Sequence, residues 1–266
     1  MKQALNTKLH SQRGASILVA LMFFLVCAMV AAVILGSATT NAQKNQQRRE
    51  EQQVYYSVSS AAKLLRDKVS RLSYEGGETA AHYGCNDYHC DENNYKLIDF
   101  QPAACTDTAQ MTPIAAKSNG TDAGDDDLLA NLLKDGVQLV YQSGLELAKD
   151  SKQPFNGWSK SFTIDDGKYT VDVTVSIDKN YTLTFQLTPK DETFRDDYGM
   201  TLVCDGKSYS TQASETITCT HNVTLQSLTE TEPTTTATTF EGTKKTTTTT
   251  VSWEPGMIYK GANSNG

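Results

Sequence analysis

The side chains of this chain best suited to metal binding or covalent bonding belong to its six cysteines and four histidines. The densest group is His82, Cys85, His89 and Cys90, spaced His-x-x-Cys-x-x-x-His-Cys. Zinc takes thiolate and imidazole ligands in tetrahedral sites, so this group is a candidate zinc site. Zinc knuckles use two tight pairs of ligands, whereas these four residues are crowded into one segment. We therefore favour a disulfide or an unpaired thiol here, and expect no bound metal and no other cofactor.

Five cysteines follow the apolar N-terminal segment described below: Cys85, Cys90, Cys105, Cys204 and Cys219. An extracytoplasmic location would allow them to form disulfides. Cys204 and Cys219 flank a predicted hairpin near Asp205-Gly206, so we predict that these two are bonded to each other. Cys85 paired with Cys90 or with Cys105 is the next expectation. Because five is an odd number, one thiol would remain unpaired.

Catalytic patterns are missing from the sequence. It contains no Gly-x-Ser-x-Gly, no His-Glu-x-x-His and no glycine-rich phosphate loop, so we expect a protein that is not an enzyme. Asp122 and Asp125 to Asp127 could bind calcium through their oxygens. Leucines follow directly, however, and acidic residues cap the free N–H groups of a helix start, so we favour a helix cap. The net charge of −7 argues against nucleic acid as a partner.

The N-terminus combines a basic leader with an apolar run of membrane-spanning length. Lys2, Lys8 and Arg13 precede the uncharged run Ile17 to Leu35, and the next charge is Lys44. About 20 apolar residues in a helix cross the hydrocarbon core of a bilayer. The basic side stays cytoplasmic, which predicts a single-pass protein of the cytoplasmic (inner) membrane with an extracytoplasmic head.

Three interpretations of this segment are open. A secretory signal would be cut after a small-x-small site such as Thr40-Asn41-Ala42, although its apolar region should be shorter. A plain anchor would never be cut. A prepilin would be cut between Gly14 and Ala15, before the apolar helix, which is then retained.

The leader and helix resemble the type IV prepilin and pseudopilin family, through Lys8, Arg13, Gly14 and the run Ala15 to Leu21. The resemblance covers about the first sixty residues and implies cleavage by a prepilin peptidase after Gly14. It also implies N-methylation of Ala15 and assembly with other pilin subunits into a pilus or a secretion pseudopilus. The chain departs from the family in starting its mature part with Ala15 instead of Phe or Met. It also has Val19 where the family has glutamate.

The residue at position 19 determines which kind of subunit the resemblance implies. In the family, the glutamate is thought to pair with the N-terminal amine of a neighbouring subunit inside the filament. A chain with Val19 cannot form that pair, which implies a minor subunit active in initiation, at the tip or in adhesion to a surface ligand. The alternative is a membrane-anchored extracellular binding module or enzyme, held by an uncleaved anchor or exported by a conventional signal peptide.

Four regions follow from the composition: a leader over 1–14, a transmembrane helix over 15–36, an amphipathic helix extension over 37–75 and a head over 76–266. The extension carries apolar residues at spacings of three and four: Tyr55, Val58, Ala62, Leu65, Val69 and Leu72. This spacing is typical of one helix face. Gly76-Gly77 end the predicted helix.

The head is expected to be mainly antiparallel β-sheet. The sequence predicts a long loop over 76–124 with one strand at 95–100, a short helix over 127–134 and a strand over 137–142. From Ser159 apolar residues alternate with polar ones, which predicts a meander with turns at Asp165-Asp166-Gly167 and Asp178-Lys179-Asn180. Further strands are expected at 200–204, 216–228 and 245–253.

Two threonine runs complete the head. For residues 234–239, an exposed strand and a disordered or glycosylated segment are both open, and for 246–250 we favour an edge hairpin. The expected fold class is α+β, with a long N-terminal transmembrane and amphipathic helix packed on an antiparallel β-sheet head.

Overall fold

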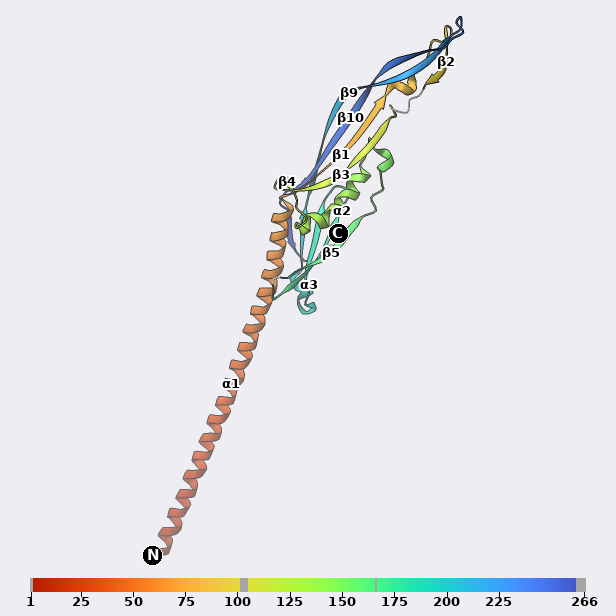
Figure 1. Ribbon diagram of the computed structural model, residues 1–266. Helices are drawn as coiled ribbons and strands as arrows, with labels where there is room; N and C mark the ends of the chain where they lie inside the picture. Colours follow the sequence, from red (N-terminus) through yellow and green to blue (C-terminus); the bar gives the residue numbers. More distant parts are fainter. Residues whose placement is uncertain (1, 101–104, 166, 262–266) are drawn as a thin grey trace. The chain divides into compact units, whose positions relative to one another are not determined.

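The computed structural model describes residues 2–100, 105–165 and 167–261 of the chain (Figure 1). It divides into two compact units, Met1–Tyr56 and Ser57–Gly266, which are described separately. The first unit consists of helix α1, which spans Lys2–Val69 and therefore continues into the second unit. Gly14 and Ala15 lie in the helical backbone of α1, and the side chain of Ala15 lies outside the described part of the chain.

Helix α1 is long and apolar enough to cross a membrane, and it is the one such helix among the described residues. Every large hydrophobic side chain from Ile17 to Leu35 is at least 46% exposed. Length and composition alone support a membrane span near the N-terminus, and a signal sequence would meet the same criteria.

The start of the second unit confirms the predicted helix face from Val58 onward, whereas Tyr55, the first residue of the predicted stripe, is 38% exposed. Val58, Ala62, Leu65 and Val69 are each at most 3% exposed and belong to the main hydrophobic core. The helix ends at Val69, however, and not at 75 as predicted. Strand β1 (Leu72–Tyr83) begins immediately afterwards, and its alternating burial places Leu72 in the core as a strand residue.

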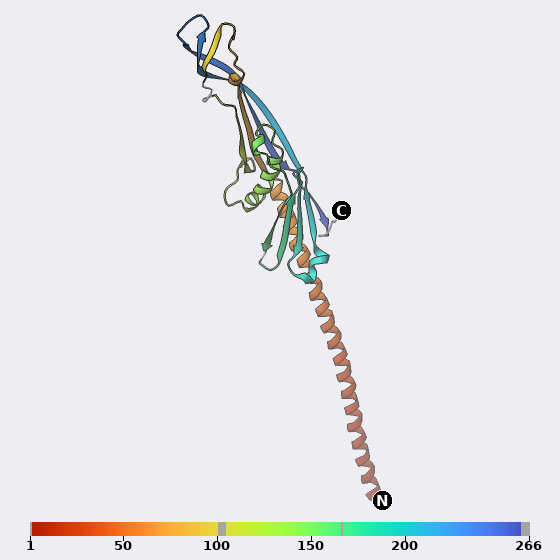
Figure 2. The same ribbon diagram turned by 90° about the vertical axis from the view of Figure 1, so that its right-hand side faces the viewer.

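Two antiparallel sheets form the head (Figures 1 and 2). The six-stranded sheet has the order β2 (Tyr95–Phe100), β9 (Gly206–Ser227), β10 (Thr234–Trp253), β1, β3 (Thr108–Ser118) and β4 (Thr121–Asp122). The five-stranded sheet has the order β11 (Met257–Lys260), β8 (Met200–Cys204), β7 (Leu183–Pro189), β6 (Thr170–Ile177) and β5 (Trp158–Asp165). Helix α2 (Leu128–Ser143), the short helix α3 (Arg195–Tyr198) and the 3₁₀ turns η1 (Gly84–Asp87), η3 (Lys149–Ser151) and η4 (Glu192–Phe194) complete the described fold. The expected α+β class is confirmed.

The long loop predicted over 76–124 is wrong, because β1 and β3 occupy much of that range and pair with each other. Gly76 lies inside a strand where the backbone needs a residue without a side chain. A Cβ atom at this position would lie 2.8 Å from the Ile114 side chain and 3.1 Å from the Tyr141 ring. Gly76 therefore allows close packing against β3 and α2 and does not act as a breaker.

The helix predicted over 127–134 and the strand predicted over 137–142 are one helix, α2. Leu129, Leu133, Val137 and Val140 are all buried and stand on one helix face, at spacings of four, four and three. Tyr74 on β1 fixes this helix by donating a 2.6 Å hydrogen bond to the Ala130 carbonyl. The β-branched residues near the end of α2 suggested a strand, but helical packing prevails over their propensity.

Both threonine runs lie in β10, which is an internal strand between β9 and β1, so the predicted edge hairpin is wrong. β9 and β10 pair over 20 positions, from Gly206 opposite Trp253 to Leu225 opposite Thr234. Threonine pairs stand across this ladder, with Oγ1 atoms 3.0 Å apart for Thr220 and Thr239. Such cross-strand pairs suit a sheet surface that is largely solvated.

Candidate functional site

A second, smaller hydrophobic cluster lies apart from the main core and contains most of the cysteines of the head. Its buried members are Cys85, Cys105, Val223 and Phe240, with Tyr83, Tyr88, Phe100, Cys219 and Leu225 packed around them. We call this group the disulfide cluster. Its residues come from the end of β1, from η1 and the residue after it, from β2, from the segment before β3, and from β9 and β10. The cluster therefore joins elements that are far apart in the sequence.

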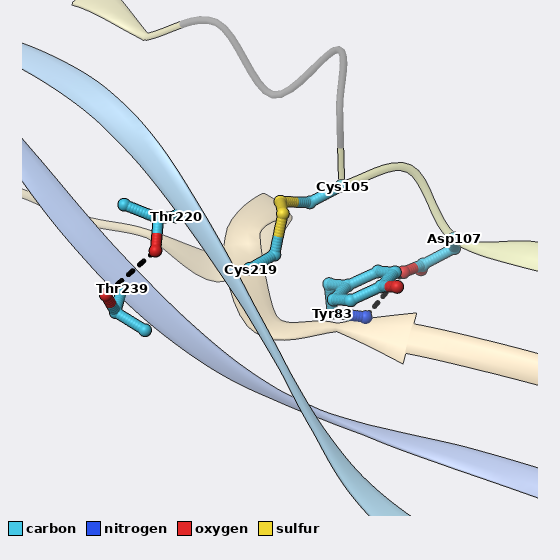
Figure 3. Close-up of a disulfide and its surroundings, with 6 residues drawn as sticks. All are labelled: Tyr83, Cys105, Asp107, Cys219, Thr220 and Thr239. Atoms are coloured by element: carbon cyan, nitrogen blue, oxygen red, sulfur yellow. Dashed lines mark hydrogen bonds between the residues drawn. A yellow bond between two sulfur atoms is a disulfide. The ribbon is translucent and has the colours of Figure 1, made fainter.

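Cys105 and Cys219 form a disulfide, with Cα atoms 6.0 Å apart and a sequence separation of 114 positions (Figure 3). The predicted Cys204–Cys219 bond is therefore wrong. Cys204 ends β8 in the five-stranded sheet, whereas β9 begins at Gly206 in the other sheet, so the two strands do not form a hairpin. From Gly206 to Cys219, β9 advances by 13 residue steps, or about 43 Å at about 3.3 Å per step.

The other thiols of the head are unpaired in the described structure. The expected bond of Cys85 to Cys90 or to Cys105 is therefore wrong. Cys204 is buried in the main core, and burial raises its pKa to about 11. Cys85 is fully buried in the disulfide cluster, and its pKa is raised by burial and, to a lesser extent, by the negative charge of Asp107. Cys90 is partly exposed, with its thiol 3.8 Å from the Tyr95 carbonyl oxygen.

Three candidate ligand atoms converge inside the disulfide cluster. The sulfurs of Cys85 and Cys105 and a ring nitrogen of His221 all lie within 4.8 Å of one another. His221 is only 5% exposed, and its Nε2 has no hydrogen-bond partner among the described residues. The imidazole packs against two aromatic rings, with its centroid 5.7 Å from that of Phe100 and 5.8 Å from that of Phe240.

The crowded group suggested by the sequence is dispersed. His82 is exposed and its Nδ1 donates a 2.7 Å hydrogen bond to the Asp107 carboxylate. The other oxygen of Asp107 accepts a 2.8 Å bond from the Tyr83 N–H (Figure 3). This backbone bond, followed by the contact with His82, holds the pKa of Asp107 below its ordinary value although partial burial opposes the shift. His89 is exposed as well. Of the predicted group, Cys85 is the member whose sulfur is one of the three converging ligand atoms.

Sequence reasoning missed His221 although a signal was present. Residues two apart on a strand point to the same face, so Cys219-Thr220-His221 on β9 places its cysteine and histidine side by side. Only the chain topology reveals that Cys85 and Cys105 reach that face.

The acidic run before α2 acts as a helix cap, as we favoured. Asp127 is the N-cap residue, and its Oδ1 accepts a 3.2 Å hydrogen bond from the Ala130 N–H. The Asp125 carbonyl accepts a further bond from the Asn131 side chain. The helix cap is therefore confirmed for the side chain of Asp127.

A polar cleft of about 350 Å³ lies elsewhere on the head. Glu78 lines it and is only 5% exposed. One oxygen of Glu78 accepts hydrogen bonds from three successive backbone N–H groups, those of Glu146, Leu147 and Ala148, at 3.0, 2.7 and 2.9 Å. The remaining lining comes mostly from hydroxyl and amide side chains of β9 and β10: Ser208, Ser210, Gln212, Thr247 and Thr249.

An apolar groove of about 440 Å³ lies where α1, α2 and β5 meet within the second unit. Its walls include Leu64, Leu128, Leu132, Phe162 and Ile164. Leu128 is 80% exposed and Leu64 is 50% exposed, which is unusual for leucines on a folded head. This groove is suited to contact with another apolar surface.

Comparisons of this chain with protein families, with curated proteins and with solved structures give no match.

Proposed function

We propose that this protein is a minor, non-catalytic subunit of a type IV pilus or a related secretion filament, with a role in initiation, at the tip or in adhesion. The observation that carries the proposal is the uncharged apolar stretch of α1. It follows Gly14 directly, leaves its large side chains exposed and continues as helix into the core of the head. Apolar side chains exposed along one helix require a lipid or protein environment.

Both environments belong to this proposal. Before assembly the helix lies in the cytoplasmic membrane, after a prepilin peptidase has removed residues 1–14. After assembly it packs laterally against the helices of other pilin subunits. The apolar groove at Leu64 and Leu128 supports the proposal, because it offers the head a further surface for a neighbouring subunit.

Val19 supports a low copy number. A repeating subunit buries its N-terminal amine in the apolar bundle, where an unpaired charge costs several kcal/mol. A subunit with valine at position 19 supplies no carboxylate for a neighbour's amine. At a filament end this omission costs least, because there is no further subunit on one side.

The processing step is tested by Gly14→Leu in the full chain, followed by N-terminal sequencing of membrane-extracted protein. We expect wild type to begin with N-methylated Ala15 and the variant to keep its leader. Gly36→Leu is the matched control, because a Cβ at Gly36 in the same helix meets nothing within 4 Å, and it should mature normally. A mature wild type that starts at Gln43 would show a signal peptide, and an intact Met1 would show a plain anchor.

The filament role is tested by deletion and by quantitative mass spectrometry of sheared filaments. We expect loss of filament initiation on deletion and an abundance far below that of the commonest subunit. Unchanged filaments after deletion would favour the rival function, an anchored binding module that uses the polar cleft at Glu78. Near-equal abundance with the commonest subunit would contradict the minor role.

A further inference from the structure

Within the disulfide cluster, the unpartnered imidazole of His221 is the feature that calls for a ligand. Its Nε2 is buried and has no partner among the described residues, although a buried polar atom without a hydrogen bond is costly. Two cysteine sulfurs lie within 4.8 Å of a nitrogen of the same ring. A third sulfur, that of Cys219, is bonded to Cys105 and is therefore also nearby.

We propose that Cys85, Cys105, Cys219 and His221 form a tetrahedral site for a thiophilic divalent cation such as Zn²⁺. The cation occupies this site when the Cys105–Cys219 disulfide is reduced. This proposal replaces our expectation from the sequence that no metal is bound. It also places the site on different residues from the group around His89.

The geometry is close to what zinc requires. Tetrahedral coordination with the usual zinc bond lengths puts two sulfurs about 3.8 Å apart and a sulfur and a nitrogen about 3.5 Å apart. Cys85, Cys105 and His221 already lie within 4.8 Å of one another, so only small side-chain movements are needed. Three thiolates and a neutral imidazole occupy all four positions, which makes the site structural and closed, without an open position for a substrate.

The apolar surroundings of the site favour a bound cation over three thiolates without one. Phe100 and Phe240 pack against the imidazole of His221, and Val223 is buried in the same cluster. Uncompensated thiolates are costly in such an apolar setting, whereas a divalent cation reduces the charge of the group from −3 to −1.

Disulfide and metal exclude each other at this site. A trialkylphosphine reduces the Cys105–Cys219 bond: the S–S bond breaks, each sulfur gains a proton, and the phosphine becomes its oxide with an oxygen from water. Binding of Zn²⁺ then releases the thiol protons of the three cysteines to solvent. In the oxidised state Cys85 and His221 alone remain, and two ligands do not hold zinc firmly. Oxidation therefore replaces a metal cross-link of η1, the segment before β3 and β9 by a disulfide that joins only the segment before β3 and β9.

The test uses the full chain in detergent micelles, oxidised or reduced with a phosphine under argon, and titrated with Co²⁺ and Zn²⁺. We expect the reduced protein to bind one equivalent of Co²⁺ with thiolate charge-transfer and tetrahedral d–d absorption, and Zn²⁺ to displace it. The oxidised protein should bind none. Cys85→Ser and His221→Ala should each weaken binding about 100-fold or more.

Two matched controls separate this site from its neighbours. Cys90→Ser and His89→Ala alter the exposed part of the group suggested by the sequence and should bind Co²⁺ like wild type. Folding is checked on the oxidised Cys85→Ser variant, which keeps the Cys105–Cys219 bond, by near-ultraviolet circular dichroism. The proposal is overturned if reduced wild type binds no metal, if His221→Ala binds as tightly as wild type, or if the two controls abolish binding.

Discussion

Replacing Glu78 tests whether a single buried carboxylate holds the segment after α2 against β1. Its Oε2 accepts three backbone N–H groups, from residues 146, 147 and 148, at distances between 2.7 and 3.0 Å. Leu145 and Ala148 in this segment are each 1% exposed, so the segment belongs to the interior of the head. The perturbations are Glu78→Gln, which keeps the shape and one oxygen, and Glu78→Ala, which removes the acceptor.

The expected magnitudes follow from the number and kind of hydrogen bonds. A bond to a charged acceptor contributes about 1.5–3 kcal/mol and a bond to a neutral one about 0.5–1.5 kcal/mol. Three bonds on one oxygen are not additive, so we expect Glu78→Gln to reduce the free energy of unfolding by about 2 kcal/mol. Glu78→Ala leaves three N–H groups without their partner, partly compensated by water from the adjoining cleft, and should cost about 4 kcal/mol.

Urea unfolding of the oxidised full chain in detergent, followed by the fluorescence of its two tryptophans, measures these changes. Glu75→Gln is the matched control on the same strand. Glu75 forms a 2.6 Å ion pair with Lys117 and is 42% exposed, so its loss should cost less than about 1 kcal/mol. Amide exchange at residues 146–148 should accelerate in both Glu78 variants. The reasoning is refuted if Glu78→Gln is as stable as Glu75→Gln, or if these amides keep their wild-type protection.

Three further outcomes are expected. The hydrogen bond from the Tyr83 N–H lowers the pKa of Asp107 below its ordinary value of 3.8. The stability that the ionised Asp107 contributes is therefore present above pH 3.8, and it is lost as the pH falls through the lower pKa of the folded state. Protection of the Tyr83 amide, measured against its intrinsic exchange rate at each pH, should therefore fall in acid, and Asp107→Asn should remove this pH dependence of the protection. Alkylation of the native oxidised head at pH 8 should label Cys90 well before Cys204, whose pKa of about 11 keeps it protonated, and mass spectrometry of the peptides gives the order. Asp127→Ala removes the cap of α2 and should lower the free energy of unfolding by about 1 kcal/mol in the same urea assay.

The parts of the fold that could be predicted are those whose side-chain period is unbroken. Alternation from Phe162 to Leu187 places β5, β6 and β7 correctly, and a carboxylate of Asp178 accepts N–H groups in the predicted turn between the last two. The stripe from Val58 to Val69 likewise identifies the buried face of α1. In each case one local pattern is sufficient because the segment has one buried face.

Features that depend on distant contacts could not be predicted. Gly76-Gly77 are typical of a break, and only the approach of Ile114 and Tyr141 explains why a strand passes through them. The connection at Asp205 resembles a hairpin turn, yet it carries the chain from one sheet to the other. The disulfide pairing follows from that crossing, so an error about one turn became an error about Cys204 and Cys219.

The position of the disulfide has an energetic reason. Among the described residues, four hydrophobic side chains are buried in the disulfide cluster: Cys85, Cys105, Val223 and Phe240. The paired stretch of β9 and β10 from Cys219 to Leu225 comprises 14 residues, seven on each strand. Ordering them costs backbone conformational entropy, which the burial of these few side chains offsets only in part. A small core of this kind needs a cross-link. The cross-link is either the Cys105–Cys219 disulfide or the proposed metal site. In both cases the cysteines hold this part of the head in a fixed conformation, so the binding of any ligand to its surface depends on them.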